Sequence, residues 1–250
     1  IADRRATWRY IRHETWANTA ARKGTATSVL YVPGADAETA SATWKKGDRA
    51  LVLHHYAGIG GRQREPAARA RLYFGHFSFG IAEVIHEPLA GELRFAITYY
   101  QIYTHNGDGL VAGALDWSRY MGDRQFGWSG LRPVCDILIM FPELNDVYLV
   151  EDRPYTVMDA IRANLEQMAA RYRIGDGRGA TYVAAANNCA QDSSQAFFAA
   201  IVEVRELLET SRDLPAWRAA NPEQAARLKR LQTGGQELRR KLIGGNARRA

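Results

Sequence analysis

The chain has 250 residues, of which 46% are hydrophobic and 24% are charged, so it can bury a core and does not have the composition of a disordered protein. No apolar run approaches the roughly 18 residues that a membrane-spanning helix needs, and we expect a soluble domain without a signal peptide. Two cysteines exclude a disulfide-rich scaffold and a four-cysteine zinc site. No feature of the sequence assigns a cell compartment.

The net charge of +6 is unevenly distributed along the chain. Residues 1–24 carry +4 and residues 210–250 carry +7, which leaves −5 between them. This pattern predicts a basic N-terminal extension over 1–44, a folded domain over 45–209 and a basic helical tail over 210–250. The basic ends are either solvated helices or contacts to an anionic membrane surface or a protein complex, and nucleic acid is not expected as a partner.

The pattern of apolar, β-branched and aromatic residues predicts strands first and helices afterwards. The expected elements in chain order are strands at 49–56, 72–85, 93–103 and 134–140, then helices at 156–173 and 190–209. Strands 72–85 and 93–103 form a long hairpin around a turn at 87–91. Glycine pairs at 234–235 and 244–245 predict breaks in the helical tail. The expected fold class is α+β, with an antiparallel sheet over 48–140 packed on the two helices.

Cys189 is the main candidate for chemistry, because it falls at the predicted start of an apolar helix directly after Asn187 and Asn188. Unpaired backbone N–H groups at a helix start stabilise a thiolate, and they can also hold an oxyanion. We therefore predict a nucleophile at Cys189, with Asn188 and Gln191 as candidates for contacts to substrate or oxyanion. The alternative is a small buried residue that only packs.

A cysteine nucleophile needs a base, and His76 at the start of the best predicted strand is the candidate. The returning strand brings Gln101 to His105 opposite His76, so either Gln101 or His105 can orient the imidazole, with a slight preference for His105. The competing interpretations are a hydrogen-bonded core histidine at 76 and a solvated turn residue at 105.

Metal and cofactor sites are not expected. Several histidines are present, but the chain has no HExxH motif and no histidine pair at helical spacing. The glycine-rich stretch 175–179 lacks the lysine and serine or threonine of a phosphate loop, which favours a turn.

Three features occur in a particular order: Gly47-Asp48 before a strand, His76 opening a hairpin, and Asn188-Cys189 heading a helix. This order resembles the circularly permuted papain-like hydrolases of the NlpC and lecithin:retinol acyltransferase type. The resemblance implies Cys189 as nucleophile, His76 as base and Asn188 as the matching neighbour. The family hairpin is shorter, and at its spacing His86 or Glu87 would be the third residue.

A second resemblance is carried by four segments between residues 45 and 205. The segments are Gly75–Val84, Tyr103–Gly109, Arg171–Gly177 and Asn188–Ala196. They look like bacterial, notably cyanobacterial, proteins described as predicted Abi (CAAX) family proteases. The chain lacks the spanning helices and the Glu-Glu-x-x-x-Arg motif of the intramembrane metalloproteases in that group, so only protease activity is taken from this resemblance.

The residues and the first resemblance together predict a thiol hydrolase or acyltransferase that forms an acyl-enzyme at Cys189. A peptide, a cell-wall amide or a lipid ester would suit the chemistry as substrate. The alternative is a non-catalytic subunit that attaches to a complex or an anionic membrane through its basic ends and aromatic hairpin.

Overall fold

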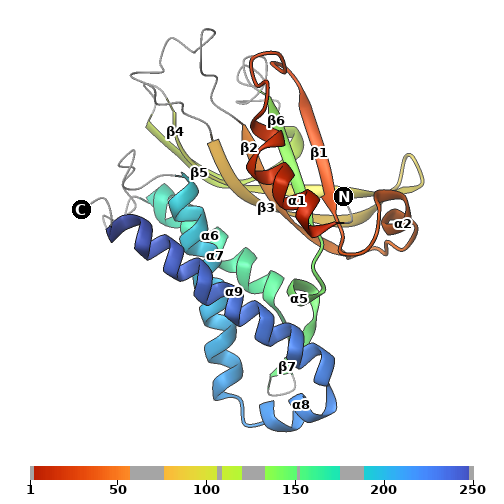
Figure 1. Ribbon diagram of the computed structural model, residues 1–250, viewed down its shortest axis with the longest axis vertical. Coiled ribbons are helices and arrows are strands. Elements are labelled where there is room, and N and C mark those ends of the chain that lie inside the picture. The colour runs from red at the N-terminus through yellow and green to blue at the C-terminus, as the bar shows by residue number, and fades with distance from the viewer. Residues whose placement is uncertain are drawn as a thin grey trace. The chain divides into compact units, whose positions relative to one another are not determined.

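The computed structural model describes residues 3–56, 76–105, 109–119, 133–150, 153–174 and 189–247 (Figure 1). The chain divides into two compact units. Unit 1 comprises residues 1–101 and 113–140, and unit 2 comprises residues 102–112 and 141–250. The predicted strand at 72–75, the glycine-rich stretch 175–179 and Asn188 lie outside the described residues.

A six-stranded sheet in the order β1-β6-β2-β3-β4-β5 lies mostly in unit 1. The strands are β1 (Ala26–Tyr31), β2 (Arg49–Tyr56), β3 (His76–Glu87), β4 (Glu92–His105), β5 (Gly109–Asp116) and β6 (Val134–Ile139). The β2–β3, β3–β4 and β2–β6 pairs are antiparallel, whereas β1 pairs with β6 in parallel. The α+β class is confirmed, but the sheet is mixed, not antiparallel, because β1 joins it beside a strand that lies far away in sequence.

The predicted hairpin is confirmed in β3 and β4. The turn lies between Glu87 and Glu92, and Glu87 Oε2 accepts a hydrogen bond from the backbone N–H of Ala90 at 2.7 Å. Gly91 has a φ of +69°, a conformation that favours glycine. The turn residues and the apolar pattern of both strands lie within one short stretch of the chain, and for this reason the hairpin could be predicted from the sequence.

The N-terminal segment is part of unit 1, not an extension added to it. Helix α1 (Arg4–Arg12) begins after Asp3, whose carboxylate caps the backbone N–H groups of Arg5 and Ala6. The short 3-10 helix η1 (Glu14–Trp16) follows, then β1 and α2 (Ala37–Ala42). The basic charge of this segment suggested a separate piece, but β1 supplies an edge strand, so the segment is built into the sheet.

The central strands β6, β2 and β3 are largely buried on both faces of the sheet. One face carries a core cluster of Ala50, Val52, Ala82, Tyr99 and Leu138. Gly80 lies on this face, and a Cβ atom there would come within 2.8 Å of the backbone oxygen of Thr98, so glycine permits close strand packing.

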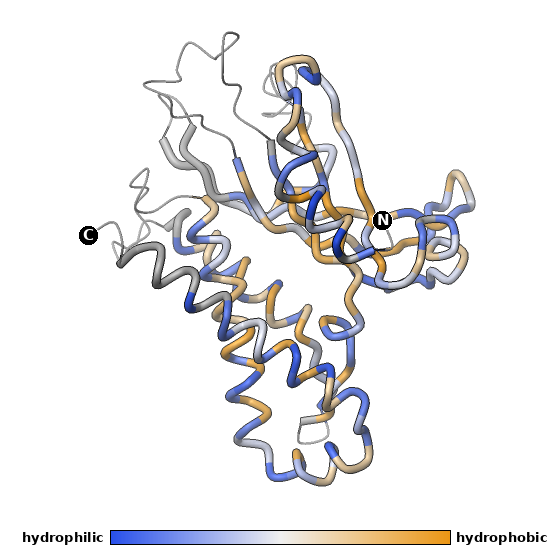
Figure 2. The backbone as a smooth tube through the Cα atoms, in the orientation of Figure 1, coloured by the Kyte–Doolittle hydropathy of each residue, from blue (hydrophilic) through white to orange (hydrophobic). Residues whose placement is uncertain are grey.

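From residue 141 onward, the described part of unit 2 consists of helices and one small hairpin, and the unit also includes the end of β4 and the start of β5. The elements are α5 (Pro142–Asn145), β7 (Val147–Val150), β8 (Arg153–Thr156), α6 (Val157–Ile174), α7 (Cys189–Thr210), α8 (Leu214–Ala220) and α9 (Pro222–Ala247). The predicted helices 156–173 and 190–209 correspond to α6 and α7, which are confirmed within one residue at each end. Apolar and polar residues alternate along these helices, as Figure 2 shows. Among the described helices, none is both long and apolar enough to cross a bilayer.

The basic tail is also integrated into a unit. Leu228 of α9 is buried, and Arg227 forms an ion pair with Asp146, its Nε lying 2.7 Å from Asp146 Oδ2. The α9 helix contacts both α5 and α7. Residues 210–247 therefore belong to the packed part of unit 2.

Helix α9 runs through both glycine pairs, so the predicted breaks are wrong. The reason at Gly235 is tertiary packing. A Cβ atom at this position would lie 2.5 Å from Cγ2 of Ile201 on α7. Glycine lets α9 approach α7 closely, and the packing compensates for the low helix propensity of the residue.

Replacing Gly235 with alanine is expected to lower the free energy of unfolding by about 1–3 kcal/mol, because Ile201 is β-branched and has little rotamer freedom to give way. Gly234 is the matched control, since a Cβ atom there meets nothing within 4 Å. Gly234→Ala should raise the free energy of unfolding by up to about 1 kcal/mol through helix propensity. Urea unfolding of both variants measures the difference, and equal effects would contradict the packing explanation.

Candidate functional site

His76 belongs to a chain of three buried polar side chains on β3 and β4. Its Nε2 atom is hydrogen-bonded to Oε1 of Gln101, and Nε2 of Gln101 donates to Oγ of Ser78 at 3.0 Å. Since an amide oxygen only accepts, the ring donates from Nε2, and in the neutral form Nδ1 carries the lone pair. The imidazole is thus held with Nδ1 as its basic atom.

Gln101 is therefore the predicted third residue that contacts His76. His105, the preferred alternative in the sequence, is the last residue of β4, and its side chain lies outside the described part of the structure. Phe79 of β3 pairs with Tyr100 of β4, and Ser78 and Gln101 are the next residues on the two strands. The register of the hairpin thus determines the partner of His76.

A second buried network lies on the same face of the sheet. Asp136 accepts hydrogen bonds from Nδ1 of His54 and from the hydroxyl of Tyr99, both at 2.6 Å. Asp136 and Ser78 are the register partners of His54 on its two sides. Burial, with the nearby charge of Asp136, raises the pKa of Tyr99 well above its usual value, so the phenol keeps its proton.

Sequence reasoning missed this second network, although one signal was present. Asp136 is the single charged residue in Val134–Ile139, a strand that is buried throughout. A carboxylate in such a strand needs hydrogen-bond donors around it. Its partners His54 and Tyr99 come from β2 and β4, which only the sheet order brings beside β6.

The opposite face of the sheet holds the other cysteine in an unreactive setting. Cys135 and His55 are register partners on neighbouring strands. Sγ of Cys135 lies 3.4 Å from the hydroxyl of Tyr10, and Nε2 of His55 lies 2.7 Å from Oγ1 of Thr15. Burial raises the pKa of the Cys135 thiol. Burial also lowers the pKa of His55 to about 4, with a further contribution from His54. Both groups are therefore neutral near pH 7, and Cys135 does not have the properties of a nucleophile.

Cys189 is the first residue of α7 and is partly exposed. This position matches the predicted helix start, and the first-turn N–H groups of a helix favour a thiolate. Gln191 lies in the same turn and is also partly exposed. Cys189 and Gln191 belong to unit 2, whereas His76 and Gln101 belong to unit 1, so their pairing stays a prediction.

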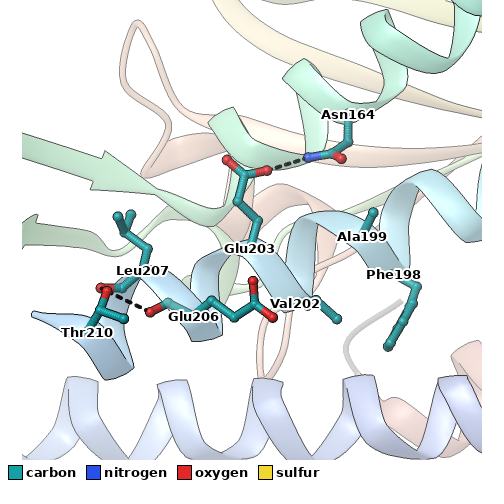
Figure 3. Close-up of a pocket in the computed structure, with 8 residues that line it drawn as sticks. All are labelled: Asn164, Phe198, Ala199, Val202, Glu203, Glu206, Leu207 and Thr210. Atoms are coloured by element: carbon teal, nitrogen blue, oxygen red, sulfur yellow. Dashed lines mark hydrogen bonds between the residues drawn. The ribbon is translucent and has the colours of Figure 1, made fainter.

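Unit 2 also has an open groove of about 590 Å³ between α6 and α7 (Figure 3). Half of its lining residues are apolar and half are polar, and among the polar ones Glu203 accepts a hydrogen bond from Nδ2 of Asn164 at 2.7 Å. The lining residues are Asn164, Phe198, Ala199, Val202, Glu203, Glu206, Leu207 and Thr210. None of the residues predicted to be catalytic lines this groove.

No family model matches this chain, and no curated protein or solved structure matches it either. Among the described residues, no group of three or more histidine, cysteine, aspartate and glutamate side chains is placed to hold a metal ion.

Proposed function

We propose that the protein is a thiol hydrolase or acyltransferase of the permuted papain-like kind, with Cys189 as nucleophile and His76 as base. The observation that carries the proposal is the buried chain His76–Gln101–Ser78, in which the amide oxygen of Gln101 accepts from Nε2 of His76. This bond makes Nδ1 the basic atom of the neutral ring, and a Cys-His-amide triad uses that atom to accept the thiol proton. The second observation is the position of Cys189 at the start of a 22-residue helix.

The reaction begins when Nδ1 of His76 takes the proton of the Cys189 thiol. The thiolate attacks the substrate carbonyl carbon, and the backbone N–H of Cys189 donates to the oxyanion, with Asn188 and Gln191 as candidate additional contacts. Collapse of the intermediate breaks the bond to the amine or alcohol, which leaves with the proton from His76. Water, deprotonated by His76, then attacks the thioester, and the acid and the free thiol are released.

The substrates that fit this chemistry are amides and esters, namely a peptide, a cell-wall amide or a lipid ester. If the acceptor is a second amine or alcohol in place of water, the same steps describe an acyltransferase. The proposal needs no cofactor, since a thiolate and an imidazole supply both the nucleophile and the proton transfers.

The proposal is tested by the pH dependence of iodoacetamide labelling at Cys189, measured by mass spectrometry on the folded full chain. Labelling should persist at least about one pH unit below the ordinary thiol pKa of about 8.5. His76→Ala should shift the labelling curve back toward the ordinary value. Because Cys189 and His76 belong to different units, this shift measures whether the two units cooperate.

Two controls belong to this experiment. His13→Ala removes an exposed histidine from the same unit as His76 and should leave the curve unchanged. Buried Cys135 provides an internal reference that labels slowly at all pH values at which the protein stays folded. If Cys189 labels with the pH dependence of an ordinary thiol, and His76→Ala does not change that dependence, the proposal is overturned and the non-catalytic binding role is favoured.

A further inference from the structure

Helix α1 has an arginine-rich face that includes one tryptophan. The residues of this face are Arg4, Arg5, Trp8, Arg9 and Arg12. At 3.6 residues per turn they fall within a single arc of about 140° around the helix axis, and Trp8 lies inside that arc. This arc, called the arginine face below, thus combines four cationic residues with one aromatic residue.

The opposite side of α1 packs on the sheet. Thr7 is 5% exposed, and the hydroxyl of Tyr10 lies 3.4 Å from Sγ of Cys135 on β6. Thr7 and Tyr10 occupy the part of the helix surface that the arginine face leaves open. Because this side is held against the sheet, the arginine face is turned outward from unit 1.

The described side chains of the arginine face are accessible. Arg5 and Arg9 are exposed, and Trp8 is 51% exposed, although tryptophan is on average one of the more buried residue types. Arg9 Nε lies 2.6 Å from Oε1 of Glu14, and both side chains of this ion pair stay accessible to solvent. An accessible indole therefore lies among accessible guanidinium groups.

The basic residues near the other end of the chain are placed differently. Arg227 and Arg230 of α9 pair with Asp146 and Glu143 at 2.7 and 2.9 Å, so carboxylates of unit 2 balance their charge. Helix α1 contains no acidic residue. Of the two basic ends, α1 is therefore the one that carries a face of a single sign of charge.

We propose that the arginine face of α1 binds the surface of an anionic lipid bilayer. Guanidinium groups bind lipid phosphates with paired N–H donors, and an indole is stabilised at the level of the headgroups, where its apolar ring and its N–H are both accommodated. An amphipathic helix with these residues lies in the plane of the interface. An acidic polypeptide would offer carboxylates to the arginines but no apolar layer to Trp8. This inference is independent of the chemistry proposed for Cys189.

The test is co-sedimentation of the full chain with vesicles of equal parts phosphatidylglycerol and phosphatidylcholine, compared with vesicles of phosphatidylcholine alone. The chain should sediment with the anionic vesicles and stay in solution with the neutral ones. Raising the ionic strength from about 0.1 M to about 1 M shortens the Debye length from about 10 Å to about 3 Å, and it should release most of the bound protein.

Two pairs of variants locate the contact. Arg5→Gln should weaken binding to the anionic vesicles about fivefold, and Trp8→Ala should weaken it about tenfold. Trp117→Ala is the matched control for the indole, because Trp117 is also 51% exposed, and Arg218→Gln is the control for an exposed arginine. Both controls should bind like the parent chain. All four substitutions change accessible side chains, so the urea midpoint should stay close to that of the parent.

Four results would overturn the proposal. The first is a chain that does not sediment with the anionic vesicles, and the second is equal sedimentation with both kinds of vesicle. The third is equal binding of all four variants, which would assign the contact to another surface. The fourth is binding to soluble polyglutamate that depends on Arg5 while vesicles are ignored, which would identify an acidic polypeptide as the partner. The labelling curve of Cys189 plays no part in this test, so either proposal can fail without the other.

Discussion

Asp136→Ala is expected to lower the free energy of unfolding by about 3–5 kcal/mol, the largest effect of any single substitution considered for unit 1. Asp136 is 5% exposed and is the shared acceptor for His54 and Tyr99, which are each 0% exposed. Its removal takes from two buried donors the acceptor that they share. Urea unfolding at neutral pH measures the loss.

Two further variants identify the source of this effect. Tyr99→Phe deletes one of the two hydrogen bonds and should cost about 1–3 kcal/mol. Asp116→Ala removes an exposed carboxylate from the same sheet and should change the free energy of unfolding by no more than about 0.5 kcal/mol. A loss in Asp136→Ala that is no larger than the loss in Tyr99→Phe would show that His54 does not depend on the carboxylate.

Acidification from about pH 7 to about pH 4 is expected to remove about 3 kcal/mol of stability through His55 alone. The pKa of His55 is lowered from 6.5 to about 4 in the folded protein, mainly by burial. Between these two values the unfolded chain binds a proton that the folded chain does not bind. Stability therefore falls as the pH falls through this window, and it rises again as the pH is raised.

The contribution of His55 is isolated by a difference between variants, since several carboxylates titrate near the lower end of the window. His55→Gln removes the titrating group, so its urea midpoint should fall less between pH 7 and about pH 4 than the midpoint of the parent chain. His86→Gln replaces an exposed histidine and should show the same fall as the parent. Parallel curves for His55→Gln and the parent would contradict a neutral, buried His55.

The elements that the sequence predicted well depend on short-range patterns. The β3–β4 hairpin has its turn residues and its alternating strands within a single stretch of chain, and α6 and α7 show a continuous amphipathic period. The same reasoning placed Cys189 at a helix start and the range from Gln101 to His105 opposite His76, with His105 slightly preferred. These inferences needed only neighbours in sequence or a register defined by one turn.

The features that the sequence did not predict depend on distant contacts. The parallel pairing of β1 with β6 joins residues about a hundred positions apart, for which no local pattern exists. The basic charge of the two ends suggested solvated extensions, yet Thr15 contacts His55 and Arg227 pairs with Asp146 inside the two units. A high charge shows that part of a segment is exposed to solvent. It does not exclude that the other side of the same segment packs against the protein.

The α+β class, the hairpin and the helix that begins at Cys189 can be predicted from the sequence alone, as can the two alternatives, Gln101 and His105, for the partner of His76. The arrangement of the strands and helices is needed to show that Gln101 holds the ring, that Asp136 joins His54 to Tyr99, and that Gly235 lies inside a continuous helix. The physical reason is that hydrogen-bond partners and close packing depend on which strands and helices become neighbours. That choice minimises the free energy of the whole chain, and no single segment specifies it.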